Sequence, residues 1–230
     1  MNFIRHHKMP RFLVALLGCT LFLAGCTSLF FQGTRERYPF VDYDKLIYEK
    51  DFFASLDGSP LSYWYFASDK NRQARPELVQ EANTKTRGLV VQYHGNAENM
   101  TIHYRSLVWL PFYGYDFMTF DYRGYAASKG ESTLSGVNAD ARAMLAFADE
   151  KSQEQNLPLV LYGQSLGGAL LLRALEDAPT PKNLKLIVIE SSFYSYKRVA
   201  RQKLANAWLF WPLSGSKFRT AFPCGVSSDG

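Results

Sequence analysis

The stretch Leu157-Pro158-Leu159-Val160-Leu161-Tyr162-Gly163-Gln164-Ser165-Leu166-Gly167-Gly168 decides the fold. It begins with an apolar run that predicts a buried strand, and residues 167–177 have a helical pattern. The serine lies at the turn between them, with a glycine two residues before it and another two residues after it. Because glycine has no Cβ, the chain can double back here and hold Ser165 in a strained conformation, with its Oγ above the sheet. Ser165 is therefore a candidate nucleophile.

Further apolar runs alternate with helical patterns along the chain. The predicted strands are residues 88–93, 117–120, 157–162 and 184–190, and the helices that follow them are predicted around residues 100–110, 135–151, 167–177 and 196–211. This alternation is typical of a parallel sheet covered by helices on both faces, so we predict an α/β fold. Upstream, two strand-like runs at 46–56 and 61–68 surround a turn signal, and the polar residues 69–87 are predicted to form a loop.

The composition excludes several classes of protein. An apolar fraction of 47% and an aromatic fraction of 15% over 230 residues suffice for the core of one domain, and they argue against a disordered or fibrous chain. The net charge is +5, and the basic residues are dispersed, so we expect no nucleic-acid partner. The cysteines, at positions 19, 26 and 224, have neither metal-ligand spacing nor the pattern of a disulfide framework. We expect no metal and no cofactor.

The N-terminus has the pattern of a targeting segment. Residues 1–11 are basic, and residues 12–24 form an apolar run. That run suits the hydrophobic region of a signal peptide, because a helix that spans a bilayer needs about 20 apolar residues. The run ends in Leu23-Ala24-Gly25-Cys26. The small residues before the cysteine allow a peptidase to approach the backbone, and a thiol can carry a thioether-linked lipid.

This ending resembles the lipobox of bacterial lipoproteins. The resemblance implies a lipoprotein signal peptide over residues 1–26, lipidation of Cys26 and anchoring to a bacterial membrane. Thr27 rather than Asp follows the cysteine, which by the same resemblance implies the outer membrane, with the protein facing the periplasm. Residues 27–45 are interpreted as a tether. The alternatives are an ordinary secretory signal, a simple membrane anchor, or a cut before Cys19, which fits less well because the apolar region would be shorter.

A second chemistry-bearing segment, Tyr93-His94-Gly95-Asn96-Ala97-Glu98-Asn99, directly follows a predicted strand. An oxyanion hole needs two backbone N–H groups aimed at one point, one from the residue after the nucleophile and one from a loop of this type. The first donor is therefore predicted to be Leu166, and the second Asn96. His94 is interpreted as a side chain that packs beneath the loop and holds it by hydrogen bonds, rather than as the catalytic base.

A third segment, Phe120-Asp121-Tyr122-Arg123-Gly124-Tyr125, closes another predicted strand and leads into Ser128-Lys129-Gly130. Its two charged side chains could act in catalysis or in support of the site. We predict that Asp121 and Arg123 brace the loops around the site through hydrogen bonds and an ion pair, and a catalytic role is the lesser alternative.

Together the strings HGNAEN (94–99), FDYRGYAASKG (120–130) and GQSLGG (163–168) resemble the α/β-hydrolase superfamily. The nearest resemblance is to small lysophospholipase-like, acylglycerol-lipase-like and serine-aminopeptidase-like hydrolases. It implies an α/β-hydrolase fold that hydrolyses a small-molecule ester, thioester or amide through an acyl-enzyme on Ser165. Ala126 stands where such proteins usually have glycine, which costs the loop some conformational freedom.

The histidine of the expected catalytic triad is missing. In this superfamily the acid and then the histidine follow the nucleophile along the chain, whereas the histidines here are at positions 6, 7, 94 and 103. The resemblance places the acid in an H-G-x-x-D string and the histidine in a G-G-H string, and neither is present. Glu190, at the end of a predicted strand, is the remaining candidate acid, and nothing in the sequence brings the His103 imidazole to Ser165. A serine without a base is a poor nucleophile at neutral pH.

The end of the chain shapes the functional hypotheses. Residues 46–220 are predicted to form a partial α/β-hydrolase domain that lacks the last strands and helices, followed by an irregular tail at 221–230. We interpret the chain as a truncated or frameshifted product. The first hypothesis is a serine hydrolase impaired by the missing histidine. The second is an inactive fragment or pseudoenzyme lipoprotein that binds without turnover, and a structural or partner-binding lipoprotein is a weaker third.

Overall fold

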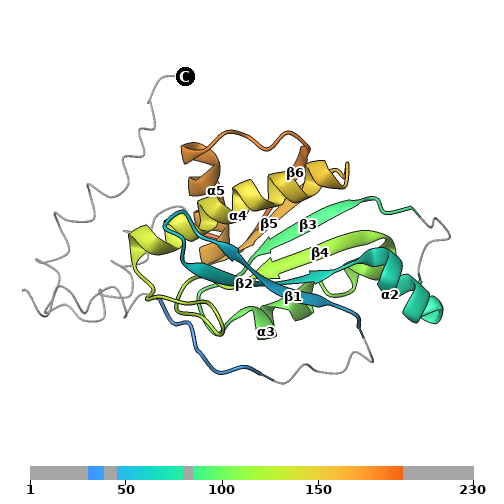
Figure 1. Cartoon of the computed structure of the whole chain (residues 1–230), viewed down its shortest axis with the longest axis horizontal. Coiled ribbons are helices and arrows are strands. Elements are labelled where there is room, and N and C mark those ends of the chain that lie inside the picture. The colour runs from blue at the N-terminus through green and yellow to red at the C-terminus, as the bar shows by residue number, and fades with distance from the viewer. Residues whose placement is uncertain (1–30, 39–45, 80–84, 194–230) are drawn as a thin grey trace, which may run out of the picture.

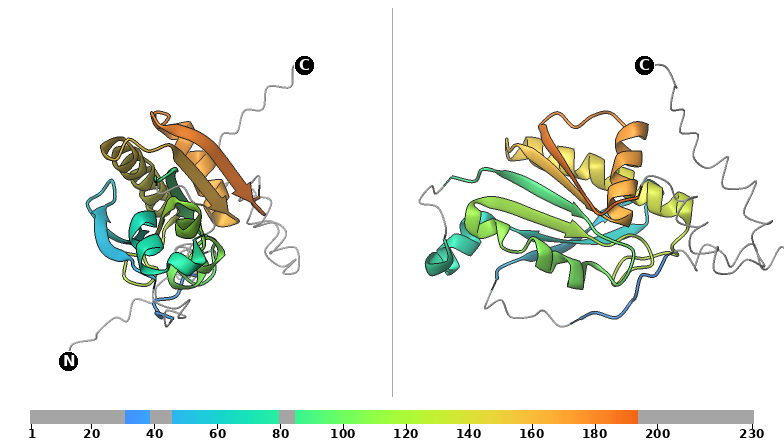
Figure 2. Two further views of the ribbon diagram at one scale, coloured as in Figure 1. Left: turned by 90° about the vertical axis from the view of Figure 1, so that its right-hand side faces the viewer. Right: turned by 180° about the vertical axis from the view of Figure 1, so that it is seen from behind.

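A six-stranded sheet runs through the centre of the chain (Figure 1). The structure, a computed structural model, describes residues 31–38, 46–79 and 85–193. The strands are β1 Glu49–Ala54, β2 Pro60–Phe66, β3 Gly88–Tyr93, β4 Tyr115–Phe120, β5 Leu159–Gln164 and β6 Leu184–Glu190, in the sheet order β1-β2-β4-β3-β5-β6. β3 to β6 are parallel, whereas β2 pairs antiparallel with both β1 and β4. The edge strands, β1 in blue and β6 in orange, lie on opposite sides of the molecule (Figure 2).

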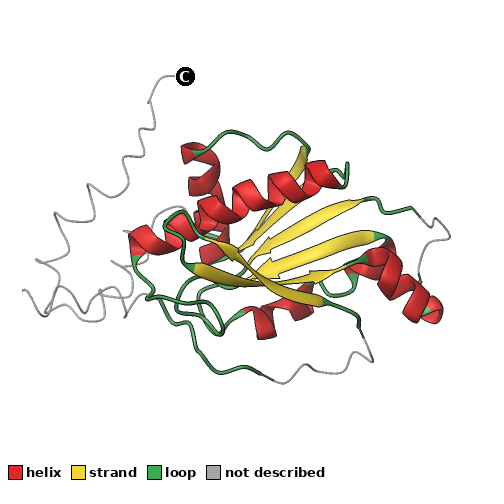
Figure 3. Ribbon diagram, viewed as in Figure 1, coloured by secondary structure: helices red, strands yellow, loops and turns green. Residues whose placement is uncertain are grey.

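Helices cover both faces of this sheet (Figure 3). One layer holds α4 Leu134–Glu154 and α5 Leu166–Asp177, and the other holds α3 Met100–His103 with the 3₁₀ turns Tyr104–Ser106 and Leu110–Tyr113. Alternate residues of β3 face these two layers. Leu89 and Val91 pack in the cluster that includes α4 and α5, whereas Val90 packs with α3. The predicted α/β fold, with a mainly parallel sheet, is confirmed.

The prediction of a loop over residues 69–87 is wrong for its first part. Helix α2 spans Ser68–Ala74, and a 3₁₀ turn spans Pro76–Leu78. α2 has no apolar stripe, and hydrogen bonds fix its position instead. The buried Asn71 side chain donates to Ile47 O at 2.8 Å and accepts from Ile47 N at 2.9 Å. Tertiary contacts of this kind override the local sequence pattern, which is uniformly polar here.

The prediction of a single helix around residues 100–110 is also wrong. It is replaced by the four-residue α3 and by two separate 3₁₀ turns. The backbone leaves helical geometry at Leu107, where φ is −125° and ψ is 2°. Pro111 lies in the first turn of the next element, where its missing N–H costs nothing.

Several predictions lie outside the described residues. They are the signal peptide with Cys26, the helix around residues 196–211 and the tail at 221–230. In the part of the chain that the structure describes, no helix is long and apolar enough to span a membrane.

The start of α5 contacts the backbone at the last residue of β3 and the residue after it. A Cβ on Gly167 would lie 1.9 Å from the Tyr93 carbonyl oxygen and 2.6 Å from the His94 carbonyl oxygen. A Cβ on Gly163 would lie 2.6 Å from the Gly168 Cα. The glycines on either side of Ser165 are therefore required where backbone packs directly on backbone.

The Gly167→Ala substitution is expected to destabilise the fold by more than about 3 kcal/mol, because the new methyl group meets backbone atoms that cannot move aside. Gly58→Ala is the matched control. Gly58 has a φ of +82°, but a Cβ there would have no neighbour within 4 Å. The control therefore measures left-handed strain alone, about 1–2 kcal/mol. Urea unfolding compares the two variants, and equal losses would contradict the packing role of Gly167.

Candidate active site

Ser165 occupies the sharp turn between β5 and α5. Its φ is 51° and its ψ is −114°, a conformation that residues with a Cβ avoid. Holding a residue there costs on the order of 1–3 kcal/mol, which neighbouring contacts must offset. Ser165 N donates to Glu190 O at 2.9 Å, and Ser165 O accepts from the Ser192 hydroxyl at 2.8 Å. The strained turn expected from the sequence is present.

The loop after β3, residues 94–99, lies beside this turn. A Cβ on Gly95 would lie 3.7 Å from the Ser165 Cβ, so the loop lies next to the serine. Asn96 is the next residue of the loop, and Leu166 is the first residue of α5. The two predicted oxyanion donors thus come from neighbouring backbone segments at the carboxyl edge of the parallel strands. The N-terminus of α5 favours negative charge at the same place.

The Asn96 side chain is held from two directions. Tyr125 OH lies 3.0 Å from both Asn96 O and Asn96 Oδ1, and Gln32 N donates to Asn96 Oδ1 at 3.1 Å. Burial raises the pKa of the Tyr125 hydroxyl, which therefore stays protonated and able to donate. These contacts fix the residue predicted to supply the second oxyanion donor.

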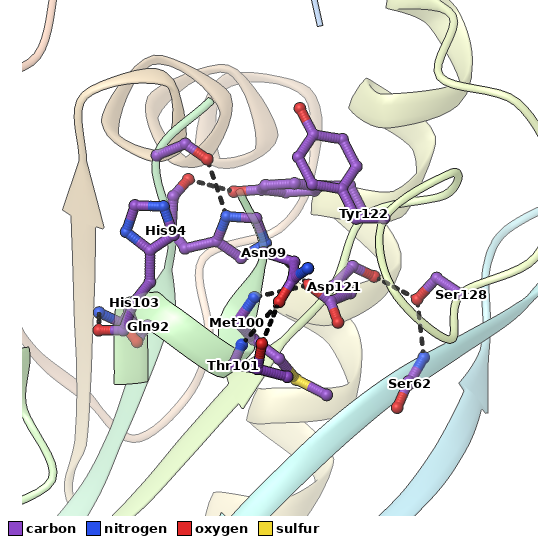
Figure 4. Close-up of polar contacts among 12 residues, drawn as sticks. Ser62, Gln92, His94, Asn99, Met100, Thr101, His103, Asp121, Tyr122 and Ser128 are labelled. Atoms are coloured by element: carbon purple, nitrogen blue, oxygen red, sulfur yellow. Dashed lines mark hydrogen bonds and ion pairs between the residues drawn. The ribbon is translucent and has the colours of Figure 1, made fainter. Parts of the chain in front are cut away.

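The His94 imidazole is fully buried beneath the loop (Figure 4). Its Nδ1 lies 2.8 Å from Gly95 O, and its Nε2 lies 3.4 Å from Asp121 Oδ1. The main-chain oxygen of His94 accepts a hydrogen bond from Tyr122 OH at 3.2 Å. These contacts join His94 to the next residue of the loop and to the segment that follows β4.

Asp121 connects the end of β4 to two other segments (Figure 4). Its Oδ1 accepts a hydrogen bond from Met100 N, at the start of α3, at 2.8 Å. Its main-chain oxygen accepts one from the Ser128 hydroxyl at 2.7 Å, and Ser128 Oγ accepts from Ser62 N at 2.9 Å. The aspartate thereby joins β2, β4 and α3 below the site.

The Arg123 guanidinium forms an ion-pair network on the adjoining loop. Its Nη2 donates to Asp140 Oδ1 of α4 at 2.7 Å, and its Nη1 donates to Asp57 Oδ2 at 2.8 Å. Hydrogen bonds to the two carboxylates raise the pKa of Arg123, and the bond to Asp140 has the largest effect. The guanidinium in turn lowers the pKa of Asp57. Because Asp140 is fully buried, removing Arg123 would leave an uncompensated charge, which typically costs about 3–5 kcal/mol. The network fastens the loop to α4 and to the β1–β2 turn.

Residues 31–38, here called the strap, run across the loops of the site. Gly33 pairs with Glu98 through an isolated parallel bridge, and the Asn99 side chain donates to Thr34 O at 3.1 Å. The strap is part of the segment interpreted as a tether, residues 27–45, and it is hydrogen-bonded to these loops and to α3 from Gln32 to Tyr38. Its polar sequence carries no periodic signal, so only the folded chain reveals its place.

The strap also supports the residue that departs from the family pattern. Ala126 has a φ of +34°, a region where glycine would be less strained. Its N–H donates to Thr34 O at 2.9 Å. A Cβ on Gly33 would lie 2.5 Å from the Tyr125 ring, so the strap packs tightly on this loop.

His103 reaches the site, which the sequence did not predict. Its Nε2 lies 2.8 Å from Ala97 O, and its Nδ1 lies 3.2 Å from Gln164 Oε1. Burial lowers the pKa of the imidazole, and the neighbouring His94 lowers it further, so the neutral ring is favoured at neutral pH. The sequence pattern gave no signal for this contact, because it depends on how the short α3 is oriented.

The described residues do not complete a catalytic triad. None of the hydrogen bonds among them joins Ser165 Oγ to an imidazole, and the nitrogens of the two histidines face other oxygens. The candidate acid, Glu190, is exposed at the end of β6, with its Oε2 3.4 Å from Gln164 Nε2. Within the same part of the chain, no group of three His, Cys, Asp or Glu side chains could hold a metal ion. Two shallow hollows lie at the amino ends of the strands, around Arg87 and Asp116, away from Ser165.

Comparison with known proteins places the chain in a family. Residues 84–220 match the family model described as serine aminopeptidase, S33. Uncharacterized protein YfhR of Escherichia coli is 28% identical over 155 residues, which are 67% of this chain and 51% of that protein. Lysophosphatidylserine lipase ABHD12 of Macaca fascicularis is 27% identical over 148 residues, covering 62% of this chain and 35% of that protein. The structure of the Pyrococcus furiosus esterase Pf2001 has the same fold, with a TM-score of 0.57 at 20% identity, covering 80% of this chain and 67% of that one.

The chain belongs to the S33 serine aminopeptidase-like family of the α/β-hydrolase superfamily, because the family model matches more than half of it. The resemblance drawn from the three sequence strings is thereby confirmed. The chain spans about half the length of the curated YfhR proteins that it matches.

Proposed function

We propose that this protein is a serine hydrolase that cleaves an ester, thioester or amide through an acyl-enzyme on Ser165. The observation that carries the proposal is the strained turn at Ser165, packed against the loop that contains Asn96. Membership of the S33 family supports hydrolysis as the reaction class. The name of one relative, a lysophosphatidylserine lipase, supports a lipid ester among the candidate substrates.

The proposed chemistry follows from these positions. Ser165 Oγ attacks the carbonyl carbon and gives its proton to solvent water, and the carbonyl oxygen becomes an oxyanion that accepts hydrogen bonds from Asn96 N–H and Leu166 N–H. The alcohol, thiol or amine then leaves with a proton, and water hydrolyses the acyl ester on Ser165. His94, Asp121 and Arg123 act by holding the loops, and Glu190 is the remaining candidate acid.

The proton of Ser165 Oγ has no imidazole acceptor within the described residues, so we expect impaired activity. An oxyanion hole and substrate binding without a base retain roughly 10³–10⁴-fold acceleration over water. We expect the chain to accelerate hydrolysis over the reaction in water by a factor of this size.

A fluorophosphonate probe on the purified chain tests the proposal. We expect slow labelling that Ser165→Ala abolishes, because the strained serine and the oxyanion donors favour a tetrahedral phosphonate even when no base assists. The matched control is Ser135→Ala, which removes an exposed hydroxyl on α4 and should label like the unmodified chain. Mass spectrometry locates the adduct. Labelling that survives Ser165→Ala would contradict the assignment of the nucleophile.

An inactive binding protein is the second candidate function, favoured by the absence of a hydrogen bond between Ser165 Oγ and an imidazole in the described chain. It predicts no labelling of Ser165 at any probe concentration. It also predicts that the unmodified chain and Ser165→Ala bind a lipid ester equally well, without turnover.

We further propose that the protein is a lipoprotein anchored through Cys26, in the outer membrane and facing the periplasm. The support is the apolar run ending in Leu23-Ala24-Gly25-Cys26, which resembles a lipobox. The strap begins a few residues after that cysteine, so an anchored chain would hold the loops of the site close to the bilayer.

Metabolic labelling with radioactive palmitate in a Gram-negative host tests the anchor. We expect label on the full chain and on Cys19→Ala, and none on Cys26→Ala, because only the thiol after the cut can carry the lipid. Cys19→Ala is the matched control, since it removes the alternative cut site. Label that persists in Cys26→Ala would overturn the assignment.

A further inference from the structure

The His103 side chain bridges two segments of the proposed site. On one side its Nε2 lies 2.8 Å from Ala97 O, in the loop after β3. On the other side its Nδ1 lies 3.2 Å from Gln164 Oε1, on the residue before Ser165. Ala97 directly follows Asn96, so the imidazole lies between the two segments that carry the proposed oxyanion donors.

The backbone of His103 is itself fixed. Gln92 Nε2, on β3, donates to His103 O at 3.1 Å. Helix α3 is capped by Asn99, whose Oδ1 accepts from Thr101 N at 3.0 Å. The ring stacks on His94 at 14° with 5.1 Å between centroids, and Figure 4 shows the two imidazoles side by side. A side chain held in this way can fix the position of one segment relative to another.

The far side of the bridge is fixed as well. Gln164 Nε2 lies 3.4 Å from Glu190 Oε2, and Ser165 N donates to Glu190 O at 2.9 Å. A neutral imidazole donates from one nitrogen only. With Nε2–H of His103 donating to Ala97 O, the Nδ1 atom accepts from the Gln164 amide when the NH₂ group of that amide faces the ring; Gln164 Oε1 accepts from Nδ1 only when that nitrogen carries the proton. The contacts therefore run without interruption from β6 through the serine turn to the loop.

The partners of the two ring nitrogens argue against proton transfer from Ser165. A Cβ on Gly95, which would lie 3.7 Å from the Ser165 Cβ, would meet the imidazole first at Cε1, 3.2 Å away. His103 Nε2 would lie 3.7 Å from the same point. Both ring nitrogens have other partners, Ala97 O and the Gln164 amide. Support is the role that this geometry fits.

We propose that His103 is a positioning residue, whose imidazole ties residues 94–99 to the Ser165 turn and sets the spacing of the Asn96 and Leu166 N–H groups. This inference rests on the proposed function of Ser165. Oxyanion donors act only when they are aimed at the developing charge, and a displacement of about 1 Å can cost about 100-fold in rate.

Two substitutions at one position test the bridge in the full chain. His103→Phe keeps a ring against His94 but has no nitrogen, whereas His103→Gln can present an amide N–H to Ala97 O. We expect His103→Phe to lower the maximal rate of fluorophosphonate labelling by between about tenfold and 100-fold, with little change in the probe concentration for half-maximal rate. It should also speed amide exchange at residues 96–98. In His103→Gln both the labelling rate and the amide exchange should stay closer to those of the unmodified chain.

A double-mutant comparison and a control complete the design. Adding Gln164→Leu to His103→Phe should cause no further loss, because both changes remove the same bridge. Ser135→Ala is again the control and should behave like the unmodified chain, since it removes an exposed hydroxyl on α4. Unchanged thermal unfolding separates a local effect from loss of the fold. If His103→Phe does not fold, the test uses the His103→Gln and Gln164→Leu variants.

Each outcome decides the proposal. If His103→Phe is labelled at the same rate as the unmodified chain and shows the same amide exchange, the proposal is overturned. Labelling lost equally in both His103 variants, with unchanged exchange, would show proton transfer instead and would also overturn it. If the unmodified chain is not labelled at all, the proposed function of Ser165 fails, and exchange alone decides: faster exchange at residues 96–98 in His103→Phe supports the bridge, and unchanged exchange contradicts it.

Discussion

The arrangement of the site depends on one close contact between backbones. The first turn of α5 lies so near the carbonyls of Tyr93 and His94 that Gly167 has no room for a side chain. This contact brings the serine turn of one strand beside the loop of the neighbouring strand, at the edge where the parallel strands end. Without it, Ser165 and Asn96 would be residues of two separate loops. The strained φ of Ser165 persists because that packing leaves the chain no alternative path.

Polar contacts then stabilise what the backbone contact brings together. Arg123 fastens one loop to α4, Asp121 joins β4 to α3, and the strap crosses both loops from outside. The short α3 adds the His103 bridge from within. Hydrogen bonds of this kind are directional, so they fix the loops in one geometry, whereas apolar contacts tolerate sliding. A preorganised arrangement is what a pair of oxyanion donors requires.

The sequence predicted the elements with strong periodicity, and it predicted the strained turn. β3 and β6 have the bounds expected for them, because continuous apolar runs between polar segments indicate strands. β3 is buried throughout, whereas most residues of β6 are exposed. It could not predict α2, which is held by the Asn71 side chain, or the short turns that replace the helix around residues 100–110. The strap and His103 were missed for the same reason. Their positions depend on single long-range hydrogen bonds, which have no local pattern.

The central claim is that Ser165, Leu166 and Asn96 form one site for a tetrahedral anion. The structure of the full chain with an alkyl boronic acid tests it most directly, because boron forms a tetrahedral anionic adduct on a reactive serine. The account predicts a bond to Ser165 Oγ and one boronate oxygen about 2.7–3.1 Å from both Asn96 N and Leu166 N. An adduct whose oxygens all face solvent, or the absence of any adduct at Ser165, would contradict it.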